Sequence, residues 1–134
     1  MSRMIFVNLP VKDLEGTKKF WLALGFRFNP QFTDDKAACL IFSDMGYAML
    51  LTEPFFKTFT GREICDTRSH CEGIFALSCE SREEVDALMV KALANGGTEP
   101  TKPQDFGFMY QRGFDDLDHH HWEVFWMDPK HGQG

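Results

Sequence analysis

The chain has 134 residues, the size of one ordinary domain. Hydrophobic residues make up 43% and charged residues 25%, so disorder, collagen and coiled coil are all disfavoured. Twenty acidic residues against 14 basic ones give a net charge of -6, the wrong sign for a protein that binds nucleic-acid phosphates. We therefore expect no nucleic-acid partner.

The chain shows no targeting or membrane pattern. No apolar run approaches the roughly 18 residues of a membrane span, and the apolar start is broken by Asn8 and Pro10 without a signal-peptide pattern. We expect a cytoplasmic protein with no membrane partner. The four cysteines have no C-x-x-C spacing, so we expect free thiols rather than a zinc knuckle or a disulfide framework.

The first half predicts a strand, a helix and three more strands. Residues 4–11 are apolar and typical of a strand, and Asp13 can cap a helix. Apolar side chains then recur at three- and four-residue steps over residues 14–24, and Gly25 is a natural helix stop. Residues 26–32, 37–43 and 47–52 are strand candidates separated by turn residues, which gives the order βαβββ.

The second half predicts the same order. Residues 74–79 read as a strand, and Ser81 with Glu84 has the spacing of a capping box that begins a helix. An apolar stripe follows, and residues 95–97, with two glycines, end the helix. Residues 98–102, 107–114 and 120–127 are the remaining strand candidates.

The two halves indicate an internal duplication. An offset of 68 residues places Leu9 on Leu77, Asp13 on Ser81 and Phe20 on Leu88, so that strand, cap and helix face coincide. A module with one helix cannot cover both faces of its sheet, which favours two copies in one α+β domain spanning residues 1–134. The expected modules are about 4–53 and about 73–128, with a linker at about 54–72 in which Pro54 can begin a short helix.

Two motifs make the sequence recognisable. The first is the run NLPVKDLE at residues 8–15, followed by KFW at 19–21 and LGF at 24–26. The second is DLDHHHWEV at 116–124, which is similar to the signature D-P-D-G-h-x-h-E-h. Together they resemble the vicinal oxygen chelate superfamily of glyoxalases, bleomycin-resistance proteins and extradiol dioxygenases. The resemblance implies that each module curls its sheet into a half-barrel and that the concave faces enclose one site.

The resemblance also implies four metal-ligand positions, one on the first and one on the last strand of each module. They fall at Phe6, at Leu51 with Glu53 as a nearby alternative, at Ile74 and at Glu123. Among the best matches only Glu123 has a competent side chain, whereas zinc, nickel or non-haem iron sites use at least three protein ligands. We therefore expect no cofactor and the loss of the family metal.

A divalent metal (zinc, nickel, iron or manganese) stays as the alternative. His119, His121 and Glu123 are spaced at i, i+2 and i+4, so they share one face if the last strand extends back that far. If any metal binds, Glu123 with His121 is the expected donor pair. Against this, His119 stands where relatives place a turn glycine, and three histidines in a row are typical of an exposed turn.

An apolar cavity with a few polar groups is the expected site. Strand alternation places Phe6 and Asn8 on one face of the first strand, and Glu123 and Phe125 on one face of the last strand. Phe106, Phe108, Tyr110 and Arg112 alternate onto one face, where they line either a pocket or ordinary core, and Arg112 pairs with Glu123, a ligand carboxylate or a surface acid. The predicted ligand-binding set is Phe6, Asn8, Leu51, Ile74, Phe108, Tyr110, Arg112, His121 and Phe125.

Three functions are compatible with these residues. The first is a metal-independent protein that binds a small, partly aromatic molecule. The second is a metal-dependent lyase, isomerase or dioxygenase acting on vicinal oxygens, with Glu123 as the candidate catalytic residue, which could also act as a general base without metal. The third is a scaffold without a small ligand. Three Trp and 14 Phe residues in two small half-barrels leave apolar surface to cover, so we expect a homodimer.

Overall fold

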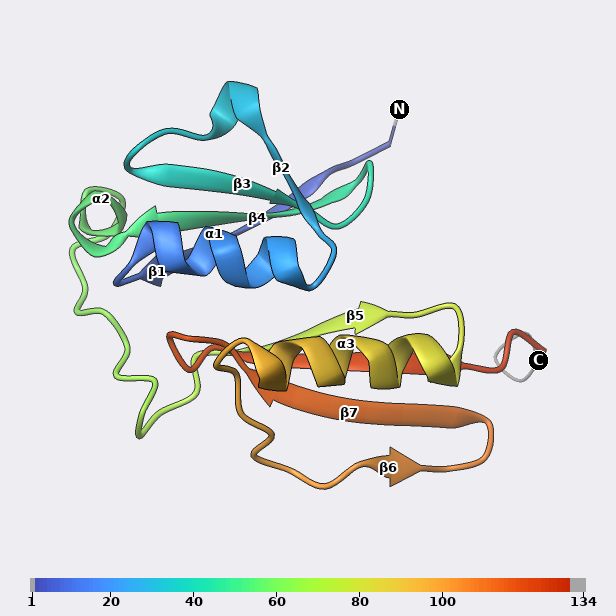
Figure 1. The fold of residues 1–134 in the computed structure, drawn as a ribbon. Helices are drawn as coiled ribbons and strands as arrows, with labels where there is room; N and C mark the ends of the chain where they lie inside the picture. Colours follow the sequence, from blue (N-terminus) through green and yellow to red (C-terminus); the bar gives the residue numbers. More distant parts are fainter. Residues whose placement is uncertain (1, 131–134) are drawn as a thin grey trace. The chain divides into compact units, whose positions relative to one another are not determined.

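The computed structural model describes residues 2–130. The chain divides into two compact units, Met1–Ile64 and Cys65–Gly134. Each unit contains a four-stranded mixed sheet with a helix against one face (Figure 1). This confirms the α+β fold with two βαβββ modules. Within the described residues no helix has both the length and the apolar character needed to cross a membrane.

The first unit follows the predicted order. Its elements are β1 (Ile5–Val11), α1 (Leu14–Ala23), β2 (Arg27–Asn29), a 3-10 turn (Pro30–Phe32), β3 (Ala37–Ile41), β4 (Gly46–Thr52) and α2 (Glu53–Lys57). The spatial strand order is β1-β4-β3-β2. β1 runs parallel to β4, and the other pairs are antiparallel.

The predicted signals begin and end α1. The Asp13 side chain accepts a hydrogen bond from the Gly16 amide at 3.1 Å, and Gly25 follows the helix with φ +100°. Phe20 and Trp21 are buried on the face that packs against the sheet. Pro54 lies in the first turn of α2, where a missing amide hydrogen costs nothing.

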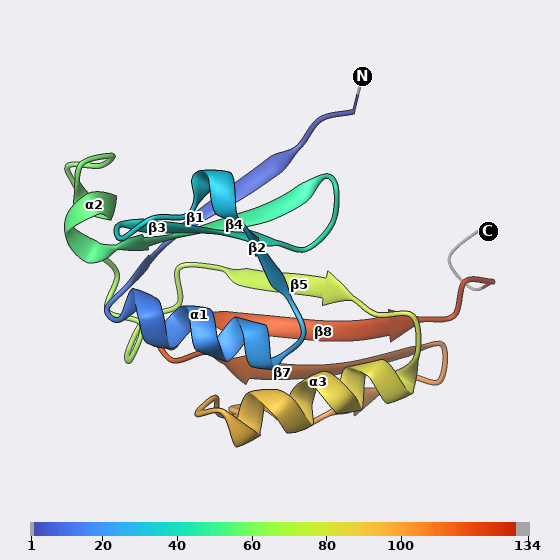
Figure 2. The same ribbon diagram turned by 45° about the horizontal axis from the view of Figure 1, so that its top comes forward.

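The second unit repeats the pattern. Its elements are β5 (Ile74–Ser78), α3 (Arg82–Ala94), β6 (Gln104–Asp105), β7 (Met109–Asp115) and β8 (His121–Met127), in the spatial order β5-β8-β7-β6. β5 is parallel to β8. Ser81 caps α3 by accepting from the Glu84 amide at 3.1 Å, and α3 runs along β7 and β8 (Figures 1 and 2).

Two expected strands differ from the observed ones. Residues 98–102 do not form a strand, and Thr98 makes only an isolated bridge to Asp115. Pro100 and Pro103 lack the amide hydrogens that a ladder needs, so pairing resumes only at β6. The expected strand at 26–32 stops at Asn29, because Pro30 begins the 3-10 turn.

Each sheet has a helix face, which packs on α1 or α3, and an opposite side that we call the open face. In the second unit Trp122 and Val124 of β8 lie on the helix face and are buried. Strand alternation therefore turns their neighbours to the open face. The cross-strand register assigns to this open face Ile74, Ala76 and Ser78 of β5, Gln111, Gly113 and Asp115 of β7, and His121, Glu123 and Phe125 of β8.

Candidate functional site

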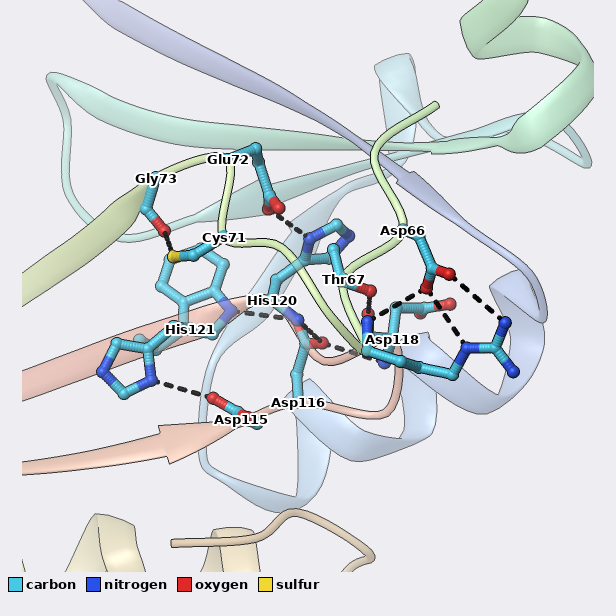
Figure 3. A network of polar contacts seen from close by, with 12 residues as sticks. Asp66, Thr67, Cys71, Glu72, Gly73, Asp115, Asp116, Asp118, His120 and His121 are labelled. Carbon is cyan, nitrogen blue, oxygen red and sulfur yellow. Dashed lines mark hydrogen bonds and ion pairs between the residues drawn. The ribbon is translucent and has the colours of Figure 1, made fainter. Parts of the chain in front are cut away.

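The polar centre of the second unit's open face is His121, held between two carboxylates. Asp115 is directly opposite His121 across β7 and β8, and its Oδ1 lies 2.8 Å from His121 Nδ1. A carboxylate only accepts, so Nδ1 is the donor of this bond. The other ring nitrogen, Nε2, lies 3.7 Å from Glu123 Oε2. The three side chains thus form an Asp115–His121–Glu123 row (Figure 3 shows the Asp115 and His121 part).

Gly113 makes room for the ring of His121. A Cβ atom at Gly113 would lie 3.0 Å from Cε1 and 3.2 Å from Nε2 of that ring. The imidazole therefore lies directly over the backbone of β7. Packing below and the Asp115 hydrogen bond at one edge fix the ring's orientation, and this fixes where Nε2 points.

Apolar side chains surround this row. Ile74 is paired with His121 and Ala76 with Glu123 across β5 and β8, and Phe125 follows Glu123 on the same face. Ile74 is 60% exposed. The open face thus combines a few oriented polar groups with apolar surface, the usual composition of a small-molecule site.

The open face of the first unit is aromatic. Phe6 of β1 stacks on Tyr47 of β4 with ring centroids 4.7 Å apart and planes 10° from parallel. Asn8 shares that strand face, but its side chain donates to the Phe6 carbonyl at 3.3 Å. Leu51 is only 2% exposed and is paired with Pro10 and Ala37. Of these residues, the Phe6 and Tyr47 rings offer a flat surface for a ligand.

The donors present do not fit the metal that the family resemblance implies. The first unit has Phe6 and Leu51 at its two ligand positions, and the second has Ile74 and Glu123, so only one of the four positions carries a donor. Among residues 2–130 no group of three or more His, Cys, Asp or Glu side chains is arranged to hold an ion. His119 does not add a ligand, because β8 begins only at His121.

Tyr110 and Arg112 lie on the opposite face of the sheet from Glu123, so Glu123 is not the partner of Arg112 among the alternatives expected for it. Arg112 is paired with Val124, so it lies on the helix face. Its guanidinium makes two 3.0 Å hydrogen bonds to Glu99 and one of 2.8 Å to Asp86 of α3. Tyr110 donates to the same Asp86 at 2.6 Å. These bonds anchor α3 to β7.

Hydrogen bonds and burial explain the pKa shifts of the side chains that anchor α3 to β7. Hydrogen bonds from Tyr110 and Arg112 lower the pKa of Asp86, and burial raises the pKa of Tyr110. The hydrogen bonds from Arg112 to Glu99 raise the pKa of the guanidinium further. Each shift favours the charge state that makes these bonds, namely ionised Asp86, neutral Tyr110 and protonated Arg112.

Phe108 lies just before β7 and is 37% exposed. Its ring centroid is 6.3 Å from that of Phe106. The loop that carries both rings is fixed by Arg82, which donates to Asp105 at 2.7 Å and to the Gly107 carbonyl at 2.9 Å. A ligand contact by Phe108 stays a prediction.

A buried polar network holds the turn before β8 (Figure 3). Asp116 accepts from the amides of Asp118 and His120 and from Trp122 Nε1, at 2.9, 3.0 and 2.9 Å. Burial raises the pKa of Asp116. His119 adopts φ +59°, so a histidine takes the left-handed conformation expected of the family glycine. The turn therefore keeps its geometry and delivers His121 to the start of β8.

The segment before β5 supports the same turn. Glu72 lies 2.7 Å from His120 Nδ1, and Thr67 donates to the Asp118 carbonyl at 2.6 Å. The sequence contains no local signal for these two contacts, because their partners lie 48 and 51 residues away. Asp115 and Gly113 were missed for a similar reason, since their place beside His121 depends on the register of β7 and β8.

The first unit also has a shallow hollow of about 580 Å³ lined by residues 25–30 and 41–44. Phe26 and Phe42 meet there edge to face with centroids 5.6 Å apart. This hollow contains none of the predicted site residues. The open face of each unit remains the candidate site of that unit.

The sequence and the fold both have known relatives. Residues 3–43 match a family model described as bleomycin resistance protein-like N-terminal. No curated protein matches the chain. Among solved structures, a hypothetical protein from S. aureus is 28% identical, with a TM-score of 0.78 over 93% of this chain and 94% of that one.

Two further solved structures share the fold. A glyoxalase/bleomycin resistance protein/dioxygenase family enzyme from Burkholderia phytofirmans is 16% identical, with a TM-score of 0.79 over 94% of this chain and 99% of that one. A fosfomycin resistance protein from Listeria monocytogenes is 21% identical, with a TM-score of 0.65 over 93% and 90%. The N-terminal family match and the doubled βαβββ fold, which these solved structures share, both agree with the resemblance to the vicinal oxygen chelate superfamily.

Proposed function

We propose that this protein binds a small, partly aromatic molecule on the open faces of its sheets, without the family metal. One observation carries the proposal: three of the four family ligand positions hold the apolar residues Phe6, Leu51 and Ile74. Phe6 also stacks on Tyr47, so an aromatic surface stands where a cation would need a donor. The names of the relatives, which include bleomycin and fosfomycin resistance proteins, are consistent with small-molecule binding.

On the open face of the second unit, the polar contacts are assigned to His121 and Glu123 and the apolar contacts to Ile74 and Phe125. On the open face of the first unit, the apolar contact is assigned to Phe6. Apolar and aromatic side chains supply the area that a small ligand buries, and a few oriented polar groups fix how it lies. The protein is proposed to work as a homodimer, as the family resemblance implies.

Calorimetric titration with three small aromatic probes tests the binding. The probes are 2-phenylethylamine, 2-phenylethanol and phenylacetate, which share a phenyl ring and differ in their polar group. We expect at least one to bind, and Phe6→Ser to weaken it at least fivefold because the stacked ring is lost. The control is Phe32→Ser, an exposed phenylalanine of the same unit. If all three probes fail to bind, the proposal is wrong.

The alternative function is a divalent-metal-dependent lyase, isomerase or dioxygenase acting on vicinal oxygens. It is favoured by the position of His121 Nε2 and Glu123 Oε2 on one face, 3.7 Å apart. Metal analysis of protein purified without a histidine tag separates the two functions. We expect well under one equivalent of zinc, nickel, iron or manganese. One equivalent per chain that disappears in Glu123→Gln would establish the alternative, with Glu123 as a ligand.

A further inference from the structure

The Asp115–His121–Glu123 row presents two hydrogen-bond acceptors side by side. Asp115 occupies Nδ1–H, so in the neutral ring the lone pair lies on Nε2. That nitrogen and Glu123 Oε2 are 3.7 Å apart, too far for a hydrogen bond between them. Gly113 keeps the ring in place, so the lone pair has a fixed direction.

One nitrogen atom with two or more N–H groups satisfies both acceptors. At hydrogen-bond distances of about 2.8–2.9 Å, a single donor atom can reach two acceptors that are 3.7 Å apart. A protonated amine has the required donors and no acceptor. A ligand carboxylate would instead face Glu123 and a lone pair, which is repulsive.

The metal-ligand positions that the family resemblance implies also indicate a positively charged ligand. Glu123 keeps the carboxylate of a cation site, while Ile74, which is paired with His121, and Ala76, which is paired with Glu123, supply no donor that could help to hold an ion. The positive charge that this carboxylate faces must then come from His121 or from the ligand. When the ring is neutral the charge must come from the ligand, because the Asp115 bond then leaves Nε2 as an acceptor.

We infer that the ligand carries a protonated amino group on its aromatic body, and that this group binds between His121 Nε2 and Glu123. The inference rests on the proposed function and names the chemistry of its ligand. Asp115 is a positioning residue, because it acts through the tautomer of His121. Glu123 and His121 contact the ligand.

The three probes of the binding test decide the inference. At pH 8 we expect 2-phenylethylamine to bind at least tenfold more tightly than 2-phenylethanol or phenylacetate. Glu123→Gln should weaken the amine at least fivefold and change 2-phenylethanol by less than twofold. The matched control is Glu83→Gln, the same change at an exposed position of α3.

Nitrogen NMR of the imidazole provides a readout that does not depend on binding. The wild-type protein at pH 8 should show His121 protonated at Nδ1 only, and Asp115→Asn should shift the proton toward Nε2, the common tautomer. A wild-type ring with a proton on Nε2 would overturn the inference. Equal binding of the alcohol or acid probe would overturn it while leaving the proposed function standing, and the absence of all binding would overturn both.

Discussion

At the scale of single residues, the position of His121 depends on the glycine at position 113 and on the buried turn before β8. Gly113 leaves the space that the imidazole fills, and His119 tolerates the left-handed backbone that starts β8 at His121. Both effects are steric and local. They explain how a departure from the family turn motif at His119 leaves the strand that follows intact.

Gly113→Ala should therefore destabilise the protein and displace the ring of His121. The new Cβ would lie 3.0–3.2 Å from two ring atoms, closer than ordinary contact. We expect the free energy of unfolding to fall by about 1–2 kcal/mol, the usual cost of overpacking, measured by urea denaturation. Gly61→Ala is the control, since a Cβ atom added at Gly61 would have no heavy atom within 4 Å. An equal effect of both substitutions would contradict the steric explanation.

The cysteines should differ strongly in reactivity. Burial, with smaller contributions from Glu84 and Glu80, raises the pKa of Cys79 to about 12, and burial also raises the pKa of Cys39. Cys71 is exposed. At pH 8 we expect iodoacetamide to modify Cys71 at least about 100-fold faster than Cys79, because the thiolate is the reactive form. Mass spectrometry of the peptides measures the rates, and all four thiols should react alike in urea.

At the scale of elements, the hydrogen bonds of Arg112 join α3 to β7. The Arg112 side chain is 17% exposed, and its guanidinium bonds both Glu99 and Asp86. Arg112→Ala should lower the free energy of unfolding by about 2–3 kcal/mol, because it leaves a partly buried Glu99 without its partner. Arg68→Ala breaks only an exposed pair with Asp66 and should cost less than about 0.5 kcal/mol. If thermal or urea unfolding showed similar losses of stability for the two variants, the prediction would be wrong.

The same anchor predicts a pH dependence. The pKa of Asp86 is lowered in the folded protein, so its stabilising contribution is present above the ordinary aspartate pKa of 3.8 and is lost as the pH falls through the folded value. The destabilisation caused by Asp86→Asn should therefore be larger at pH 7 than at pH 3. Urea unfolding at both pH values measures it, with Glu83→Gln as the control. If Asp86→Asn destabilised the protein more at pH 3 than at pH 7, the prediction would be contradicted.

The elements were largely predictable from the sequence, because caps and apolar periodicity are local signals. Asp13 and Ser81 begin the two helices as predicted. The alternation of Tyr110 and Arg112 onto one face was also predicted, but the choice of face was not. That choice depends on the pairing of Arg112 with Val124, which is set by a register between strands rather than by either strand alone.

At the scale of the whole molecule, the two units share a topology but differ in the chemistry of their open faces. The first presents stacked Phe6 and Tyr47, and the second presents the Asp115–His121–Glu123 row. The 68-residue offset predicted the shared topology, because topology follows from element order. It could not predict the difference, since Gly113 and Asp115 become neighbours of His121 only when β7 pairs with β8.

Apolar residues that remain on the surface lead to the prediction of a homodimer. Phe6 is 45% exposed, Ile74 60% and Val90 66%. Large apolar side chains on a small acidic protein favour association with a second copy, since their burial contributes about 25 cal/mol per Å². Light scattering at tens of micromolar protein should give twice the chain mass of 15.4 kDa. A mass near that of one chain, unchanged as the concentration rises, would show that the protein is a monomer.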